Sequence, residues 1–313
     1  MNSLQQIKQA WLGGDITRED FWRAMQDRHL RLREYQALIR ETEVAQIEIT
    51  GDELQVVHAS GVRLVWYPED LRTAPDVLVN SGAYEPEESA ALLKAAAGAK
   101  VIFDVGANIG FYSLSWANGL APGGTVHSFE PVPVTYDRLS RNIEINHRGD
   151  TVLANNFALG SEKSTVTIFL PAFSGSSASS LKNLHPEEES VEVEAQVETL
   201  DAYFAARGLD RLDFMKIDVE GAELLVLQGG RETLARHKPL LFMELLRKWA
   251  KPFGYHPNDV IALLGELGYK CYSHQYGKLA RFTEMTDESV ETNFFFAHPD
   301  HHGAWMTAMG LAA

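Results

Sequence analysis

The chain has 313 residues, and 45% of them are hydrophobic, which is enough for one large domain with an appendage. Its formal net charge of -15 argues against a nucleic-acid-binding protein, because phosphate contacts need clustered Lys and Arg. One cysteine, Cys271, excludes an intramolecular disulfide. The N-terminus has no charged segment followed by an apolar run, and no stretch is apolar enough to insert in a membrane. We therefore expect a soluble, cytoplasmic protein.

Residues 1–45 have the pattern of a helical appendage. Thr17 can cap a helix, with Asp20 at the capping-box position. Apolar residues then recur at helical spacing from Phe21 to Ile39, with arginines around them. One helix face therefore requires a partner. Packing on the rest of the chain, a homodimer, and recognition of a carrier protein or substrate all remain open.

Three further units are expected after this appendage. Residues 46–81 alternate between polar and apolar side chains and are interrupted by Gly-Asp and Ser-Gly, which predicts a ribbon of two or three antiparallel strands and a connector. Residues 82–300 alternate between strand and helix, which predicts a parallel sheet with right-handed crossovers. Residues 301–313 are expected to form a solvated tail.

The stretch from Val101 to Ser113 reads as strand, glycine turn and helix. Five mainly apolar residues precede Gly106, and a helical pattern follows Gly110. The turn would place backbone N–H groups beside the acid Asp104 and would let a ligand approach the backbone. A second predicted strand ends in Glu130, at the position where nucleoside-binding α/β proteins hold a ribose diol. This arrangement predicts a nucleoside pocket.

Acidic residues also follow two later strands. The predicted strand 212–217 leads to Asp218 and Glu220, and the strand 239–244 ends in Glu244. Because ligands bind at the carboxyl ends of strands in an open α/β sheet, we expect these three carboxylates in the same crevice as Gly106. They suit a general base or the ligand set of a divalent cation. The sequence leaves that choice, and any metal assignment, open.

Three motifs together resemble the FkbM family of S-adenosylmethionine-dependent methyltransferases. They are Asp104–Gly110, Phe129–Pro131 and Lys216–Glu223, and the similarity covers roughly residues 82–298. The resemblance implies an α/β fold with the Rossmann-like class I sheet, mostly parallel with an antiparallel last strand. It also implies S-adenosylmethionine as cofactor, S-adenosylhomocysteine as product, and transfer of a methyl group to a hydroxyl of a sugar or a polyketide- or peptide-type natural product.

The same resemblance suggests which residues bind and react. The residues expected to bind the cofactor are Tyr84, Glu85, Asp104, Gly106, Asn108, Gly110, Phe111, Tyr112, Ser113, Glu130, Pro131, Asn156, Phe157, Ala158 and Asp218. Among them, Asn156 is expected either at the base edge of the adenine, with Phe157 covering the base, or as a plain turn residue. The expected catalytic residues are Asp218, Glu220 and Glu244. The polar loop 171–186 is expected to be either a lid or a plain linker.

Two other function classes are weighed against this prediction. A nicotinamide-dependent Rossmann oxidoreductase is disfavoured, because the turn reads Gly-Ala-Asn-Ile-Gly and no Tyr-x-x-x-Lys pair stands at a suitable place. A non-catalytic nucleoside-binding module is disfavoured by the joint presence of the three motifs. The acceptor is expected to be a small molecule or a glycan, whose identity the motifs do not specify.

Overall fold

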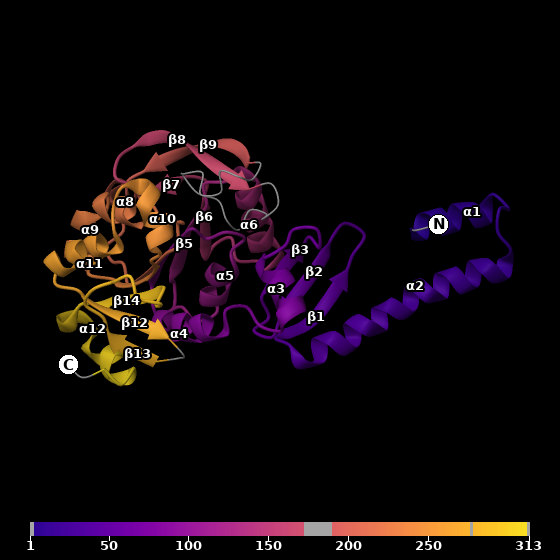
Figure 1. Cartoon of the computed structure of the whole chain (residues 1–313), viewed down its shortest axis with the longest axis horizontal. Coiled ribbons are helices and arrows are strands. Elements are labelled where there is room, and N and C mark those ends of the chain that lie inside the picture. Colours follow the sequence, from indigo (N-terminus) through magenta and orange to yellow (C-terminus); the bar gives the residue numbers. More distant parts are fainter. Residues whose placement is uncertain (1–2, 172–189, 276–277, 312–313) are drawn as a thin grey trace.

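A computed structural model describes residues 3–171, 190–275 and 278–311. An eight-stranded sheet forms its centre (Figure 1). Its strands, in spatial order, are β13 (Lys278–Arg281), β12 (Lys270–Gln275), β14 (Asn293–Ala297), β11 (Leu240–Glu244), β10 (Phe214–Ile217), β4 (Val101–Val105), β5 (Thr125–Phe129) and β6 (Val152–Asn155). The strands β11, β10, β4, β5 and β6 are parallel, and β14 is antiparallel to β11 and β12. This order confirms the predicted α/β class, whereas β13 was not predicted.

Helices cover both faces of the sheet, because successive strand residues point to opposite sides. Ile102 of β4 belongs to one apolar cluster, and its neighbours Val101 and Phe103 belong to the other. The first face packs against α4 (Pro86–Ala96), α5 (Phe111–Ala117), α6 (Pro133–Ile145) and α12 (Pro299–Ala308). The second face packs against α7 (Leu200–Ala206), α8 (Glu223–Gln228), α9 (Arg231–His237) and α11 (Pro257–Glu266). The short α10 (Arg247–Ala250) and η3 (Lys251–Phe253) follow β11.

The C-terminal segment differs from the solvated tail that the sequence predicted. Residues 299–308 form α12, which begins with a proline in its first turn. Met306 is buried in the core, and the ring of Trp305 lies 5.3 Å from that of Phe295. The expected tail is instead a helix, because these apolar residues pack on the first face of the sheet.

The predicted ribbon contains three antiparallel strands, β1 (Val44–Ile49), β2 (Leu54–His58) and β3 (Arg63–Trp66). Two asparagines hold its last strand: Asn142 of α6 accepts the backbone N–H of Val65 at 2.8 Å, and Asn146, which caps the end of α6, accepts that of Arg63 at 2.9 Å. A helix that was not predicted, α3 (Ala74–Ser81), follows and buries Leu78. The ribbon and its connector are therefore fastened to the central domain.

A second, small sheet lies beside the main one. It consists of β7 (Ala158–Leu159), β9 (Ser190–Glu198) and β8 (Ser164–Pro171), in that order. The predicted lid or linker, 171–186, lies outside the described residues except for its first residue.

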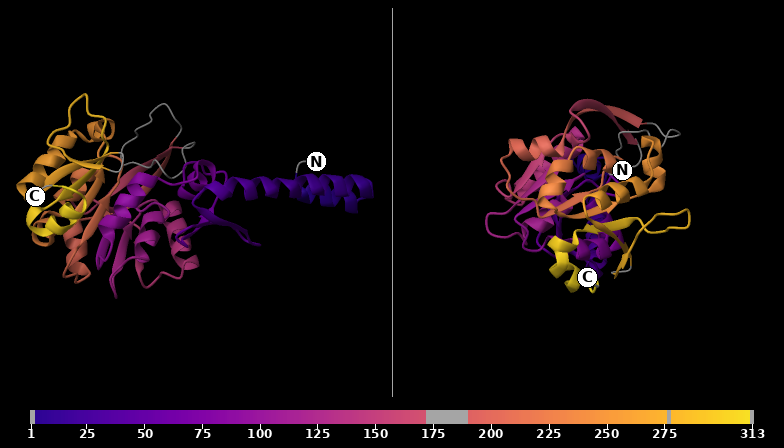
Figure 2. Two further views of the ribbon diagram at one scale, coloured as in Figure 1. Left: turned by 90° about the horizontal axis from the view of Figure 1, so that it is seen from below. Right: turned by 90° about the vertical axis from the view of Figure 1, so that its left-hand side faces the viewer.

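The N-terminal segment forms a helical hairpin that projects from the body of the molecule (Figures 1 and 2). It contains α1 (Leu4–Leu12) and α2 (Arg18–Leu38), and η1 (Ile39–Glu41) joins it to β1. As predicted, Thr17 caps α2: its hydroxyl accepts the backbone N–H of Asp20 at 3.1 Å. Among the described helices, none is both long and apolar enough to cross a membrane.

Candidate active site

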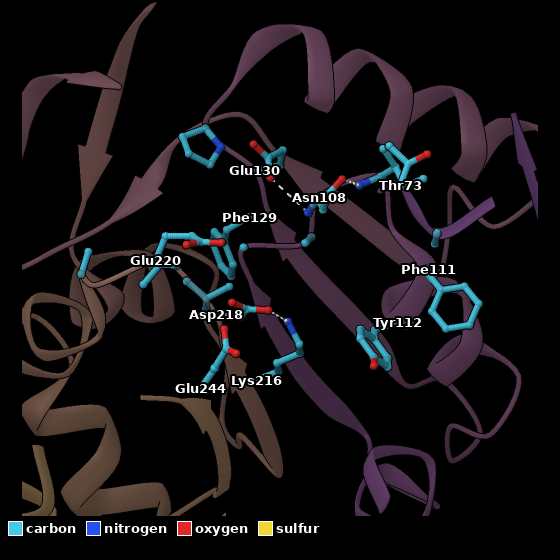
Figure 3. Close-up of a pocket in the computed structure, with 18 of the residues that line it drawn as sticks. Thr73, Asn108, Phe111, Tyr112, Phe129, Glu130, Lys216, Asp218, Glu220 and Glu244 are labelled. Carbon is cyan, nitrogen blue, oxygen red and sulfur yellow. Dashed lines mark hydrogen bonds and ion pairs between the residues drawn. The ribbon is translucent and has the colours of Figure 1, made fainter. Parts of the chain in front are cut away.

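A cavity of about 410 Å³ lies at the carboxyl ends of β4, β5, β10 and β11 (Figure 3). Each of these ends contributes a residue that the sequence singled out, namely Gly106, Glu130, Asp218 and Glu244. The other predicted residues in its lining are Tyr84, Glu85, Asn108, Phe111, Tyr112, Pro131, Ala158 and Glu220. The parallel sheet therefore brings these side chains together, as expected for strand ends that share one edge.

Gly106 allows the ends of two strands to approach closely. Its φ is +83°, and a Cβ there would lie 1.8 Å from the carbonyl oxygen of Asp218. The backbone N–H groups of Gly106 and Ala107 both donate to the carbonyl of Phe129 at 3.0 Å. Any larger residue would thus separate β4 from β10 and disturb the link to β5.

Glu130 is held at the end of β5 by the backbone. Its carboxylate accepts the N–H of Asn108 at 3.0 Å (Figure 3). It also accepts the N–H of Val132 at 3.0 Å. The residue is only 5% exposed, and this burial raises its pKa to about 7, although the two N–H groups oppose the shift. The carboxylate is thus fixed in orientation while it still faces the cavity.

The buried Lys216 forms an ion pair with Asp218, whose side chain is partly exposed to the cavity. The residue is 4% exposed, and its Nζ lies 2.8 Å from Asp218 Oδ2 (Figure 3). The same nitrogen stands 5.3 Å from the centre of the Tyr112 ring. Burial lowers the pKa of Lys216, but Asp218 and Asp104 more than offset this and leave the pKa raised. A charged ammonium is therefore fixed behind one carboxylate of the cavity.

The two glutamates near this pair are in a different electrostatic state. Burial, and then the negative charge of Asp218, raise the pKa of Glu220 to about 9 and that of Glu244 to about 8. Both side chains are therefore mainly protonated at neutral pH, and a protonated carboxyl group can donate a hydrogen bond. The cavity thus combines an ion-paired aspartate with two neutral acids.

Glu223 holds the turn that carries Glu220. Its carboxylate accepts the N–H of Gly221 at 3.1 Å and the hydroxyl of Tyr255 at 2.9 Å. Glu220 itself has a φ of +53°, a conformation that is unfavourable for residues other than glycine. The buried hydrogen bonds of Glu223 offset this strain and keep the turn in place.

Another strained residue, Glu85, lines the same cavity. Its φ is +43°, and its carboxylate accepts the Tyr112 hydroxyl at 2.6 Å. Burial raises the pKa of Glu85. The Tyr84 ring lies 5.0 Å from that of Phe111. Backbone strain of this kind is concentrated at ligand sites, and Arg72 and Asn108 of the lining also have positive φ.

Three predicted cofactor residues lie behind the cavity wall. Asp104 is 1% exposed and accepts the Ser113 hydroxyl at 2.5 Å. Its other oxygen, Oδ1, has no hydrogen-bond partner within the described chain. Gly110 packs against Leu139, whose side chain leaves no room for a Cβ. These residues support the turn from behind rather than line the cavity.

Asn156 and Phe157, which were expected beside the adenine, do not line the cavity. The Asn156 amide donates to the carbonyls of Glu130 at 2.9 Å and Pro131 at 3.2 Å. The Phe157 ring packs 5.7 Å from Phe129. The physical reason is that the Asn156 amide is hydrogen-bonded to the backbone and the Phe157 ring is packed in the aromatic core. Of this segment, only Ala158 lines the cavity.

The structure adds lining residues that the sequence analysis did not assign. They are Arg72, Thr73, Ala74, Val77, Ala107, Ile109, Val105, Phe129, Leu159, Ile168, Lys216, Val219, Ala222 and Trp249. Thr73 precedes α3, and its position before Ala-Pro was an available helix-start signal. A lysine within an apolar strand was the available signal for Lys216. The first four lie before residue 82, so the cavity crosses the predicted domain boundary.

The residues that line the cavity fit a nucleoside cofactor. The buried Glu130 carboxylate at the cavity wall suits a ribose diol. Within the described residues, no group of three or more His, Cys, Asp or Glu side chains is arranged to hold a metal ion. The metal assignment that the sequence left open therefore stays open.

Comparison with known proteins identifies the family. The "Methyltransferase FkbM domain" family matches residues 104–271, more than half of the chain. "Methyltransferase sdnD" of Sordaria araneosa is 33% identical over 199 residues, which cover 54% of this chain and 73% of that protein. "31-O-demethyl-FK506 methyltransferase FkbM" of Streptomyces tacrolimicus is 30% identical over 41% of this chain and 58% of its own length.

A third relative, "Hexuronic acid methyltransferase AglP" of Haloferax volcanii, is 28% identical over 75% of this chain and 87% of that protein. These matches support the predicted methyltransferase over the oxidoreductase and the non-catalytic module. S-adenosylmethionine is thus the methyl donor. The chain belongs to the FkbM family of S-adenosylmethionine-dependent methyltransferases.

Proposed function

We propose that this enzyme transfers the methyl group to a hydroxyl oxygen of a sugar or of a polyketide- or peptide-type natural product. The observation that carries the proposal is the group of carboxyl side chains from Asp218, Glu220 and Glu244 around the buried Lys216. A hydroxyl must lose its proton as the new C–O bond forms, and a carboxylate can accept that proton. The names of the Streptomyces and Haloferax relatives suggest the two acceptor classes.

The cofactor-binding part of the proposal rests on the β4 and β5 ends. Glu130 would hold the ribose hydroxyls, with the Asn108 backbone fixing its carboxylate. The turn at Gly106 would let the backbone approach the cofactor. When bound, S-adenosylmethionine supplies a methyl group already activated by a positive sulfonium. The chain has only to bind, orient and exclude water.

Asp218 is the proposed base. Its ion pair with Lys216 keeps the carboxylate in one orientation, with the ammonium behind it and the cavity in front. Glu220 and Glu244, protonated at neutral pH, would donate hydrogen bonds to acceptor oxygens. Trp249 lines the same cavity and offers an apolar surface to a ring or chain of the acceptor.

The proposal is tested with methyl-labelled S-adenosylmethionine and a set of acceptors. The set contains 31-O-demethyl-FK506, a neutral oligosaccharide, and an oligosaccharide with a hexuronic acid. A methyl ether survives mild alkali, whereas a methyl ester is hydrolysed. We expect an alkali-stable labelled product. Labelling that appears only as an alkali-labile ester would contradict hydroxyl methylation and would point to a carboxylate acceptor.

A further inference from the structure

The projecting hairpin exposes an unusual amount of apolar surface. We call residues 4–38, which contain α1 and α2, the arm. Of the fourteen large apolar side chains that the described residues expose, eight lie in the arm. They are Leu4, Trp11, Leu12, Trp22, Leu30, Leu32, Tyr35 and Leu38, with exposed fractions from 41% to 65%.

The arm does not cover this surface by itself. Ile7 and Phe21 are the arm's apolar residues that the described structure buries, and Phe21 stacks on Trp11 at 4.5 Å. At the base of α2, Tyr35 lies 6.2 Å from Trp66 of the ribbon. Beyond that contact the arm extends away from the body (Figure 2). Because helices of this length gain most of their stability from packing, a second surface must cover the arm.

The area and charge of the arm fit a second copy of the chain. Three of the eight side chains are aromatic, and a whole aromatic side chain buries about 150–250 Å²; with five smaller leucines, and each side chain about half exposed, the arm offers on the order of 500 Å². A standard interface buries about 800 Å² on each partner. The arm contains six basic and five acidic side chains, while the rest of the chain holds the whole acidic excess. A nearly neutral arm can pair with the arm of a second copy without charge repulsion, whereas a strongly acidic protein or an anionic membrane would be bound better by an excess of basic side chains.

The outer face of α2 is self-complementary. Trp22, Met25, Gln26, His29, Leu30 and Arg33 line a groove along it. Trp22 and Leu30 stand at equal distances in sequence before and after Gln26. In an antiparallel pair with a two-fold axis near Gln26, the Trp22 of one copy meets the Leu30 region of the other. Arg33 then meets Glu19 of the second copy, which adds two oppositely charged contacts.

We propose that the arm is a homodimerisation element in which α2 pairs antiparallel with α2 of a second copy about an axis near Gln26. Because α1 packs on the opposite face of each α2, the two arms form a layer of four helices with the α2 pair at its centre. The acidic bodies then lie at opposite ends, where their mutual repulsion is smallest. Homodimers with two-fold symmetry are the most frequent assemblies of soluble proteins.

Sedimentation velocity of the full-length chain at micromolar concentration tests the proposal. We expect the wild type to be a dimer, and Trp22→Glu and Leu30→Glu to be monomers. Val290→Glu is the matched control, because Val290 is a 72% exposed apolar residue outside the arm, and it should remain a dimer. Circular dichroism melting checks that each variant folds. A wild type that is monomeric overturns the proposal. A monomeric wild type whose arm binds anionic vesicles also overturns it, because the arm would then be a membrane-binding element.

A charge exchange tests the register. Arg33→Glu should weaken the dimer roughly tenfold, because two exposed ion pairs become two repulsive contacts. The double variant Glu19→Arg/Arg33→Glu should restore the wild-type dissociation constant. A folded double variant that stays as weak as Arg33→Glu overturns the pairing about Gln26. A folded Trp22→Glu variant that still dimerises overturns the arm as the interface.

Discussion

The amide substitution Asp218→Asn gives the sharpest test of the proposed base. It keeps the size of the side chain and removes its ability to accept a proton. A positioned general base contributes about 10²–10⁴ in rate, so turnover should fall by that factor. Affinity for S-adenosylhomocysteine should change by less than about tenfold, because the lost charge acts on the acceptor oxygen rather than on the bound nucleoside.

The ion pair of Lys216 adds a stability effect that must be separated from the chemistry. The Asp218→Asn substitution would replace the charged partner of the buried Lys216 ammonium, 2.8 Å away, by a neutral amide oxygen. Asp104 and Glu85 still favour that charge, so we expect a loss of roughly 1–3 kcal/mol in folding free energy. The double variant Lys216→Met/Asp218→Asn should recover most of this stability and none of the turnover.

Initial rates with methyl-labelled cofactor, calorimetry with S-adenosylhomocysteine and thermal melting measure the three quantities. Asp213→Asn is the matched control: Asp213 precedes the other end of β10, where it accepts the N–H groups of Lys100 and Val101. It should lower stability without a specific loss of turnover. An Asp218→Asn enzyme that is folded and turns over within about threefold of wild type would refute the assignment of a base.

Three further outcomes follow from the same geometry. Glu130→Ala should weaken S-adenosylhomocysteine binding by roughly 1–3 kcal/mol, the scale of charge-assisted hydrogen bonds, and calorimetry would expose an unchanged affinity as a failure. Glu244→Gln should raise the melting temperature relative to wild type at about pH 9 and leave it nearly unchanged at about pH 5. The sign follows from the Glu244 pKa of about 8 in the folded chain, compared with 4.5 in the unfolded chain. Between these two pH values only the unfolded chain releases the proton, so the contribution of Glu244 to folding stability is full below pH 4.5 and is lost as the pH rises through 8. Turnover should be insensitive to EDTA if Asp218 takes the proton directly; loss with EDTA and recovery with Mg²⁺ would instead favour a bound metal.

The sheet was predictable because its signals are local. The apolar run before Gly106, the acid after the strand ending at Phe129 and the acid at Glu244 each identify a strand and its carboxyl end. Sheet topology then brings those ends together without further information. The carboxylates could therefore be named as neighbours from the sequence.

The remaining features depend on contacts distant in sequence. Whether Asn156 faces a ligand or the carbonyl of Glu130 is decided by packing, which a turn signal does not specify. A lysine within an apolar strand marks Lys216 as unusual, but its position behind Asp218 follows only from the structure of β10. The C-terminal helix was missed because Met306 gains its burial from strands far away in the chain.

A crystal structure of the complex with S-adenosylhomocysteine tests the central claim most directly. The account predicts both ribose hydroxyls within hydrogen-bond distance of the Glu130 carboxylate, and the sulfur on the side of the cavity lined by Asp218 and Glu244. A cofactor whose ribose lies away from Glu130, or whose sulfur faces away from Asp218, would contradict the proposed site.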